Sequence, residues 1–180
     1  DRLQPWNLEK IGHVNGVDHN ESISVGPRGE AYTTGFVTCR VFRIDLETNS
    51  AEAFATTAPR RVLGQVVDAD GNLYCAQPDW PGSQVVKITP DAQQSVYSRG
   101  PAGTGFMSAN TPVFDRAGNM YVSDTGSWSE KIDGHICRIR PGGGDAEVWT
   151  KHPIDTPNGI AIDPEEKFIY YFETWGNSIS

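Results

Sequence analysis

The chain has 180 residues and a mass of 19.7 kDa, which is enough for one hydrophobic core and predicts a single domain spanning 1–180. Its formal charge of -8 argues against a nucleic-acid partner, because phosphate binding needs a basic face. The sequence also has neither an apolar run long enough for a membrane span nor the pattern of a signal peptide. We therefore expect a cytoplasmic protein without a membrane partner, whose partner is a small-molecule substrate.

One sequence pattern occurs four times along the chain: a short apolar strand, a polar turn that usually carries Gly, and a second strand that begins with an aromatic residue. The copies run over 21–32, 63–74, 110–121 and 158–170. An apolar run, a glycine turn and a second apolar run predict a β-hairpin in each copy. The tyrosines at the start of the second strands lie about 40–50 residues apart, which is the spacing of propeller repeats.

Two further strands are expected after each of the first three hairpins. The third strands are predicted at 41–45, 85–89 and 136–140, where a cation alternates with apolar neighbours, and the fourth strands at 51–55, 94–97 and 146–149. Four antiparallel strands per repeat predict the blades of an all-β propeller. A β-sandwich is the alternative, but it does not require the aromatic residue to recur in register.

The fourth copy reaches 175–180 just as its third strand should begin. About three and a half blades are therefore predicted, with starts near 21, 63, 110 and 158. Because a propeller removes its sheet edges only by closing, we expect the remaining blades of the same polypeptide or a second chain to complete the ring.

The first strand of each blade is expected to line the central channel. Polar residues occupy one equivalent position of this strand in three of the four copies. Glu21, Asn110 and Asn158 occupy the same offset from the turn in three copies, and Leu63 takes that place in the second copy. Three oxygen donors that converge from three blades predict a divalent cation site, with Ca²⁺ first and Mg²⁺, Mn²⁺ or Zn²⁺ as alternatives. The competing interpretation of each residue alone is a turn former or a solvated channel residue.

The same residues give the chain a resemblance to the senescence marker protein/gluconolactonase/regucalcin-like (SGL) family of lactonase-type propellers. The matching phrases lie at 110–115, 118–124, 157–163 and 172–174. The resemblance implies a six-bladed ring holding a divalent cation, with Glu21, Asn110 and Asn158 as the first three ligands. The fourth ligand of the family is a later Asp that also serves in catalysis. That Asp would lie beyond Ser180, so no catalytic residue is assigned.

A metal-dependent hydrolase acting on a lactone or related ester is the function that this resemblance implies. Asn110 and Asn158 would orient substrate as well as metal, and Met107 and Ser108 stand where several family members carry an Arg that holds a sugar lactone. Phe106, Met107 and Trp128 are candidates for an apolar pocket wall. A non-catalytic propeller that binds a small molecule or protein around a structural cation is the alternative, and a strictosidine-synthase-like condensing enzyme is a more distant one.

Other chemistry-bearing residues receive structural interpretations. Cys39, Cys75 and Cys137 are odd in number and far apart, so we expect reduced thiols carried on strands. His13, His135 and His152 are interpreted as loop or surface residues, whereas His19 lies two residues before Glu21 and is placed at the channel entrance. Asp124 is interpreted as a turn residue at a strand end, with an outer role beside the metal as the alternative.

Overall fold

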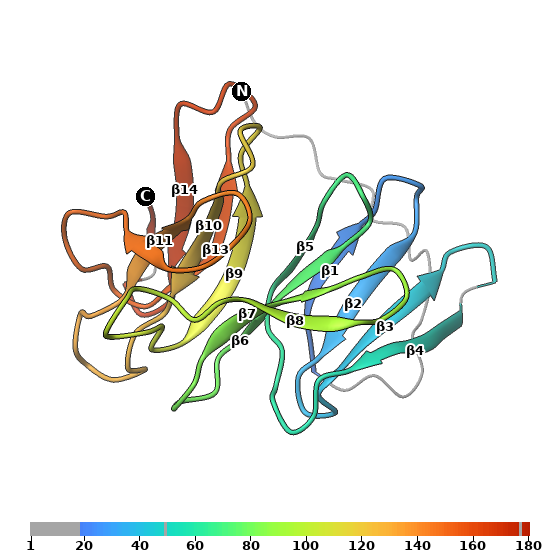
Figure 1. Ribbon diagram of the computed structural model, residues 1–180. Helices are drawn as coiled ribbons and strands as arrows, with labels where there is room; N and C mark the ends of the chain where they lie inside the picture. The colour runs from blue at the N-terminus through green and yellow to red at the C-terminus, as the bar shows by residue number, and fades with distance from the viewer. Residues whose placement is uncertain (1–18, 49, 177) are drawn as a thin grey trace.

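The computed structural model describes residues 19–48, 50–176 and 178–180, and these form four antiparallel sheets without an α-helix. In each sheet, every strand pairs with the next one along the chain (Figure 1). The first two sheets contain β1 (Asn20–Val25), β2 (Ala31–Gly35), β3 (Arg40–Asp45) and β4 (Ser50–Thr56), then β5 (Gln65–Val67), β6 (Leu73–Gln77), β7 (Gln84–Ile88) and β8 (Gln94–Ser98). The last two contain β9 (Ala109–Phe114), β10 (Met120–Asp124), β11 (His135–Ile139) and β12 (Ala146–Val148), then β13 (Pro157–Ile162), β14 (Ile169–Glu173) and β15 (Ser178–Ile179).

The sheets are the blades of a propeller, with their first strands innermost. β1 contacts β5, β5 contacts β9, and β9 contacts β13, so the first strands face a common centre while the later strands lie farther out. The predicted all-β propeller fold is confirmed. The third strand of the last blade, which was expected only to begin, is present as the short β15 paired with β14.

Each hairpin between a first and a second strand closes in the same way. The backbone N–H of Gly71 donates to the carbonyl of Asp68, and Gly118 and Glu166 donate to Asp115 and Asp163 at the matching positions. Gly71 and Gly118 have φ values of 85° and 82°, in the left-handed region that favours glycine, which explains why glycine recurs in the turn. Glu166 adopts the same conformation with φ 57° and is the exception in the fourth copy.

The core lies between successive blades and is built around the repeated tyrosines. Tyr32 packs with residues of the second blade, Tyr74 with Phe114 and Met120 of the third, and Tyr121 with residues of the fourth. Burying an aromatic side chain of this size stabilises the fold by about 1.5–3 kcal/mol. The repeat therefore provides the contacts that join one blade to the next.

The cysteines are free, but only two lie on strands. Cys75 and Cys137 are buried in β6 and β11, whereas Cys39 lies in the turn before β3 with φ 52°. The expectation that all three are strand-borne is wrong for Cys39, because the Gly35–Arg40 connection is a turn rather than an early start of the third strand.

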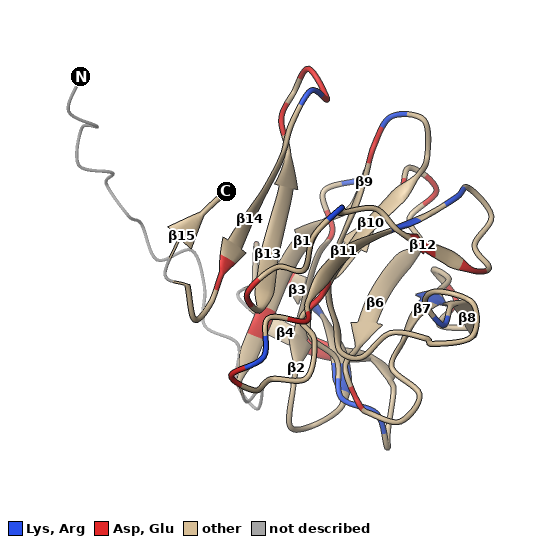
Figure 2. Ribbon diagram, turned by 90° about the vertical axis from the view of Figure 1, so that its left-hand side faces the viewer, with Lys and Arg blue, Asp and Glu red and all other residues tan. Residues whose placement is uncertain are grey.

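The charged residues lie mainly on the turns and edges of the blades. In the view of Figure 2, Lys and Arg are scattered among Asp and Glu. Within the part of the chain that the structure describes, no helix has the length and apolar character needed to cross a bilayer.

Candidate functional site

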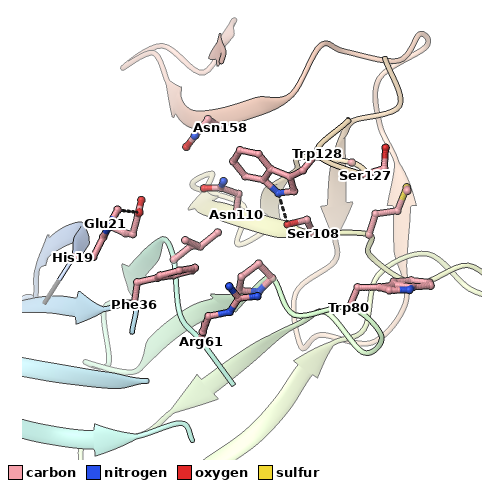
Figure 3. A pocket seen from close by; sticks show the side chains of 14 residues that line it. His19, Glu21, Phe36, Arg61, Trp80, Ser108, Asn110, Ser127, Trp128 and Asn158 are labelled. Carbon is pink, nitrogen blue, oxygen red and sulfur yellow. Dashed lines mark hydrogen bonds and ion pairs between the residues drawn. The ribbon is translucent and has the colours of Figure 1, made fainter. Parts of the chain in front are cut away.

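A pocket of about 700 Å³ opens at the ends of the first strands, around the centre of the propeller. Glu21, Leu63, Asn110 and Asn158 line it together, one from each blade. Figure 3 shows the side chains of Glu21, Asn110 and Asn158 directed toward the same space. The structure thus brings the predicted channel residues to one cavity.

A β-bulge accounts for the direction of these three side chains. The pairing of β1 with β2 shifts between Asn20 and Ile23, that of β9 with β10 between Ala109 and Pro112, and that of β13 with β14 between Pro157 and Ile160. At each shift two residues of the inner strand face one residue of the second strand. A bulge redirects side chains at the end of a strand, and here the first of the two residues is Glu21, Asn110 or Asn158.

The two asparagines are oriented by matching threonines. Asn110 donates through Nδ2 to Thr125 Oγ1 at 3.1 Å, and Asn158 donates to Thr174 Oγ1 at 3.2 Å. Each threonine directly follows the second strand of its blade. A side-chain amide whose nitrogen is held by a hydroxyl presents its oxygen in a fixed direction, which suits a hard cation or a polar group of a substrate. The Asn110 oxygen also accepts from Thr111 Oγ1 at 3.0 Å, which leaves it one further lone pair for a ligand.

Glu21 is paired with His19 at the pocket mouth. His19 Nε2 lies 2.5 Å from Glu21 Oε1, and the imidazole is tilted against Phe36 with ring centroids 5.7 Å apart. His19 is therefore where the sequence placed it, at the channel entrance. The ion pair is formed by Oε1, and a carboxylate has a second oxygen, so the pair and a cation ligand are compatible roles.

Carboxylate and amide oxygens fit a cation such as Ca²⁺ in their chemistry. Among the described residues no three His, Cys, Asp or Glu side chains gather as a metal site, since two of the three donors in this pocket are asparagines. The metal and substrate roles of Glu21, Asn110 and Asn158 remain predictions.

Met107 and Ser108 also line the pocket, on a loop that Asp124 anchors. The Asp124 carboxylate accepts the backbone N–H groups of Met107 at 2.9 Å and Ser108 at 2.6 Å. Its side chain is buried at the end of β10, and this burial raises the pKa of Asp124 although the backbone donors oppose the shift. The turn role expected for Asp124 is incomplete, because the carboxylate holds part of the pocket wall in place.

Trp128 lies on the pocket wall, as its sequence position suggested, whereas Phe106 does not. Trp128 donates its indole N–H to Ser108 Oγ at 2.9 Å. Phe106 is buried in the core between the second and third blades, where it packs with Tyr74 and Val85. The assignment of Phe106 to the pocket wall is wrong. Successive side chains point to opposite sides here, so Met107 faces the pocket and Phe106 faces the core.

Sequence reasoning did not identify several other wall residues, among them Phe36, Arg61 and Trp80. Arg61 is ion-paired with Asp79 at 2.5 Å and its guanidinium lies 4.8 Å from the centre of the Phe36 ring. These residues come from loops at the ends of strands, where the four copies differ in sequence. The signal for Phe36 and Trp80 is that aromatic residues recur shortly after the second strands, and Arg61 has no such signal.

The comparisons with known proteins agree with this fold. The family model described as SMP-30/Gluconolactonase/LRE-like region matches residues 93–180. No curated protein matches the chain by sequence.

Solved structures with the same fold include a gluconolactonase from Xanthomonas campestris, at 20% identity and a TM-score of 0.77, over 91% of this chain and 57% of that one. A virginiamycin B lyase from Staphylococcus aureus is 17% identical with a TM-score of 0.71, over 92% of this chain and 52% of that one. A chain of a nidogen/laminin complex is 14% identical with a TM-score of 0.71, over 87% of this chain and 57% of that one. The chain thus spans little more than half the length of these structures.

Proposed function

Because residues 93–180 form an SMP-30/gluconolactonase/LRE-like region, we propose that the protein is a hydrolase of the lactonase type that acts on a lactone or related ester and depends on a divalent cation. Glu21, Asn110 and Asn158 would hold the cation, with Ca²⁺ as the first candidate. The observation that carries the proposal is that three oxygen donors from three blades line one pocket at equivalent bulges.

The chain's own residues would bind and orient the reactants. Thr125 and Thr174 fix the amides of Asn110 and Asn158, so that the amide oxygens need little rearrangement when a ligand enters. A bound cation supplies Lewis acidity toward a lactone carbonyl. Met107 and Ser108, held by Asp124, would bound the space for the substrate beside these donors.

Ring completion is part of the same proposal. Tyr170 is 47% exposed although its counterparts in the other blades are buried, and the related solved structures are longer than this chain. We propose that further blades, from the same polypeptide or a second chain, cover that face and provide the general base. The buried thiols of Cys75 and Cys137 are compatible with a cytoplasmic location.

The test combines metal binding with turnover in the full-length protein. Calcium titration calorimetry and a panel of lactones and esters, each assayed with and without EDTA, should show metal binding and metal-dependent hydrolysis. Asn158→Ala should weaken both, whereas Asn158→Asp, which retains an oxygen donor, should keep most of the metal affinity. Hydrolysis that is unaffected by EDTA and by Asn158→Ala would contradict the proposal. Metal binding without any hydrolysis would favour the non-catalytic alternative.

A further inference from the structure

We propose that the pocket selects lactones or esters that carry an alkyl or aromatic substituent, rather than polyhydroxylated sugar lactones. The inference rests on the proposed function and adds a substrate class to it. It comes from the apolar side chains that line the rest of the pocket, beside the polar donors.

The apolar part of the pocket lining includes large side chains that are exposed to solvent. Trp80, Trp128 and Met107 are 68%, 45% and 37% exposed, and all three line the pocket with Phe36 and Leu63. Figure 3 shows the indole of Trp128 beside Asn110, so the apolar wall reaches the polar donors. Exposed apolar groups gathered at one concave site are typical of a ligand-binding surface.

Trp128 is held in place by an unusual backbone and by its indole nitrogen. Its φ of 51° lies in the left-handed region, which is rare for a bulky residue and is found mainly where function requires a fixed side chain. The hydrogen bond to Ser108 fixes the indole edge, and Asp133 accepts both the backbone N–H and the hydroxyl of the preceding Ser127. The ring is therefore a preorganised apolar surface.

The polar side chains on this wall are already engaged with other protein groups. Ser108 Oγ accepts from Trp128, Ser127 Oγ donates to Asp133 at 2.7 Å, and Arg61 is paired with Asp79. A sugar ring can stack on an indole, but its hydroxyls need hydrogen-bond partners when they leave water. An alkyl or aryl group has no such requirement, so this wall favours an apolar substituent.

Kinetics with a matched set of six-membered lactones in the full-length protein would test the inference. We expect kcat/KM for δ-decalactone to exceed that for δ-valerolactone and glucono-δ-lactone by at least about tenfold, the scale of discrimination of an apolar pocket. Trp128→Ala should remove most of this preference. The control is Ile132→Ala in the same loop, which is exposed but lies outside the pocket lining and should keep the preference.

A binding measurement separates this inference from the hydrolase proposal. The lactam that corresponds to δ-decalactone resists hydrolysis, and calorimetry should show that it binds at least about tenfold more tightly than unsubstituted 2-piperidone. Trp128→Ala should weaken its binding while Ile132→Ala does not. This result would support the inference even if no lactone is hydrolysed. Equal binding of the two lactams, equal effects of the two substitutions, or a preference for glucono-δ-lactone would overturn it.

Discussion

Tyr121 and Tyr170 occupy the same place in successive blades but have different surroundings. Tyr121 is 8% exposed and packs against the fourth blade, whereas Tyr170 is 47% exposed on β14. Phe168 and Phe172 lie on the same open face, at 61% and 56% exposed. The repeat therefore prepares an apolar face on every blade, and only a following blade turns that face into core.

The largest expected difference between covered and open faces comes from the tyrosines. Tyr74→Ala should lower the free energy of unfolding by about 3–5 kcal/mol, because it removes a buried aromatic ring and its hydrogen bond to Asp68. Tyr170→Ala should cost less than about 1 kcal/mol in residues 1–180, because the ring is exposed. Urea denaturation measures both.

Tyr74→Phe isolates the contribution of the hydroxyl and should cost about 1 kcal/mol. Equal losses for Tyr74→Ala and Tyr170→Ala would show that the two faces do not differ in packing. If blades added beyond Ser180 cover β14, the cost of Tyr170→Ala should rise toward that of Tyr74→Ala in the longer protein.

A second comparison uses Gly64 and Gly159, which directly follow the channel residues Leu63 and Asn158. A Cβ on Gly64 would lie 2.6 Å from the carbonyl oxygen of Asn110 in the next blade, whereas a Cβ on Gly159 would meet only Phe172, at 3.7 Å. Gly64→Ala should therefore destabilise the fold by about 1–3 kcal/mol through overpacking. Gly159→Ala should be nearly neutral. Thermal denaturation of the two variants gives the contrast, and a neutral Gly64→Ala would contradict the close approach of the blades.

Substitution of Ser123, which lies on a covered blade face, should have a smaller effect on the free energy of unfolding. Ser123 donates to the carbonyl of Asn158 at 2.6 Å and accepts the N–H of Thr111 at 3.0 Å. Ser123→Ala should cost about 1–2 kcal/mol, because both groups lose a partner. Hydrogen exchange at the Thr111 amide should accelerate in the variant. Phe172 takes this position on the open face, and Phe172→Leu should leave the same amide unchanged.

The smallest effect expected is the pH dependence that arises from Asp68 in the turn of a covered blade. Burial raises the pKa of Asp68, but hydrogen bonds from Asn72 and Tyr74 outweigh burial and lower the pKa below its usual value. A carboxylate whose pKa is lower in the folded state stabilises the fold at pH values above its pKa in the unfolded state, which is about 4. This stability is lost as the pH falls through the pKa of the folded state. Asp68→Asn should make stability less dependent on pH between about pH 5 and 2. Asp70→Asn in the same turn serves as the control and should retain the slope of the unmodified chain.

The repeated parts of the molecule could be predicted, because local rules act on them four times. Glycine turns and alternating strands predicted the hairpins, and the constant offset from the turn predicted that Glu21, Asn110 and Asn158 share a pocket. Loop contacts could not be predicted in this way. Asp124 binds backbone groups of Met107 and Ser108, which precede it by many residues, and nothing in the repeat specifies such a contact.

Phe106 and Cys39 show the limits of the same reasoning. Phe106 was assigned to the pocket from its neighbours in sequence, but its backbone N–H donates to Arg99 and the ring enters the core beneath the loop. Cys39 was assigned to a strand together with Cys75 and Cys137, but the turn continues through position 39. Both residues lie near the border between a loop and a strand, and tertiary packing determines where their side chains lie.

Adjacent blades are joined through backbone carbonyls of the channel residues. Thr34 Oγ1 donates to the carbonyl of Leu63, the N–H of Gly64 donates to that of Asn110, and Ser123 Oγ donates to that of Asn158. Every residue has a backbone carbonyl, so leucine and asparagine can both accept the hydrogen bond that joins two blades. The scaffold thereby leaves the chemistry of its centre open to exchange, one residue at a time, as new substrates are selected during evolution.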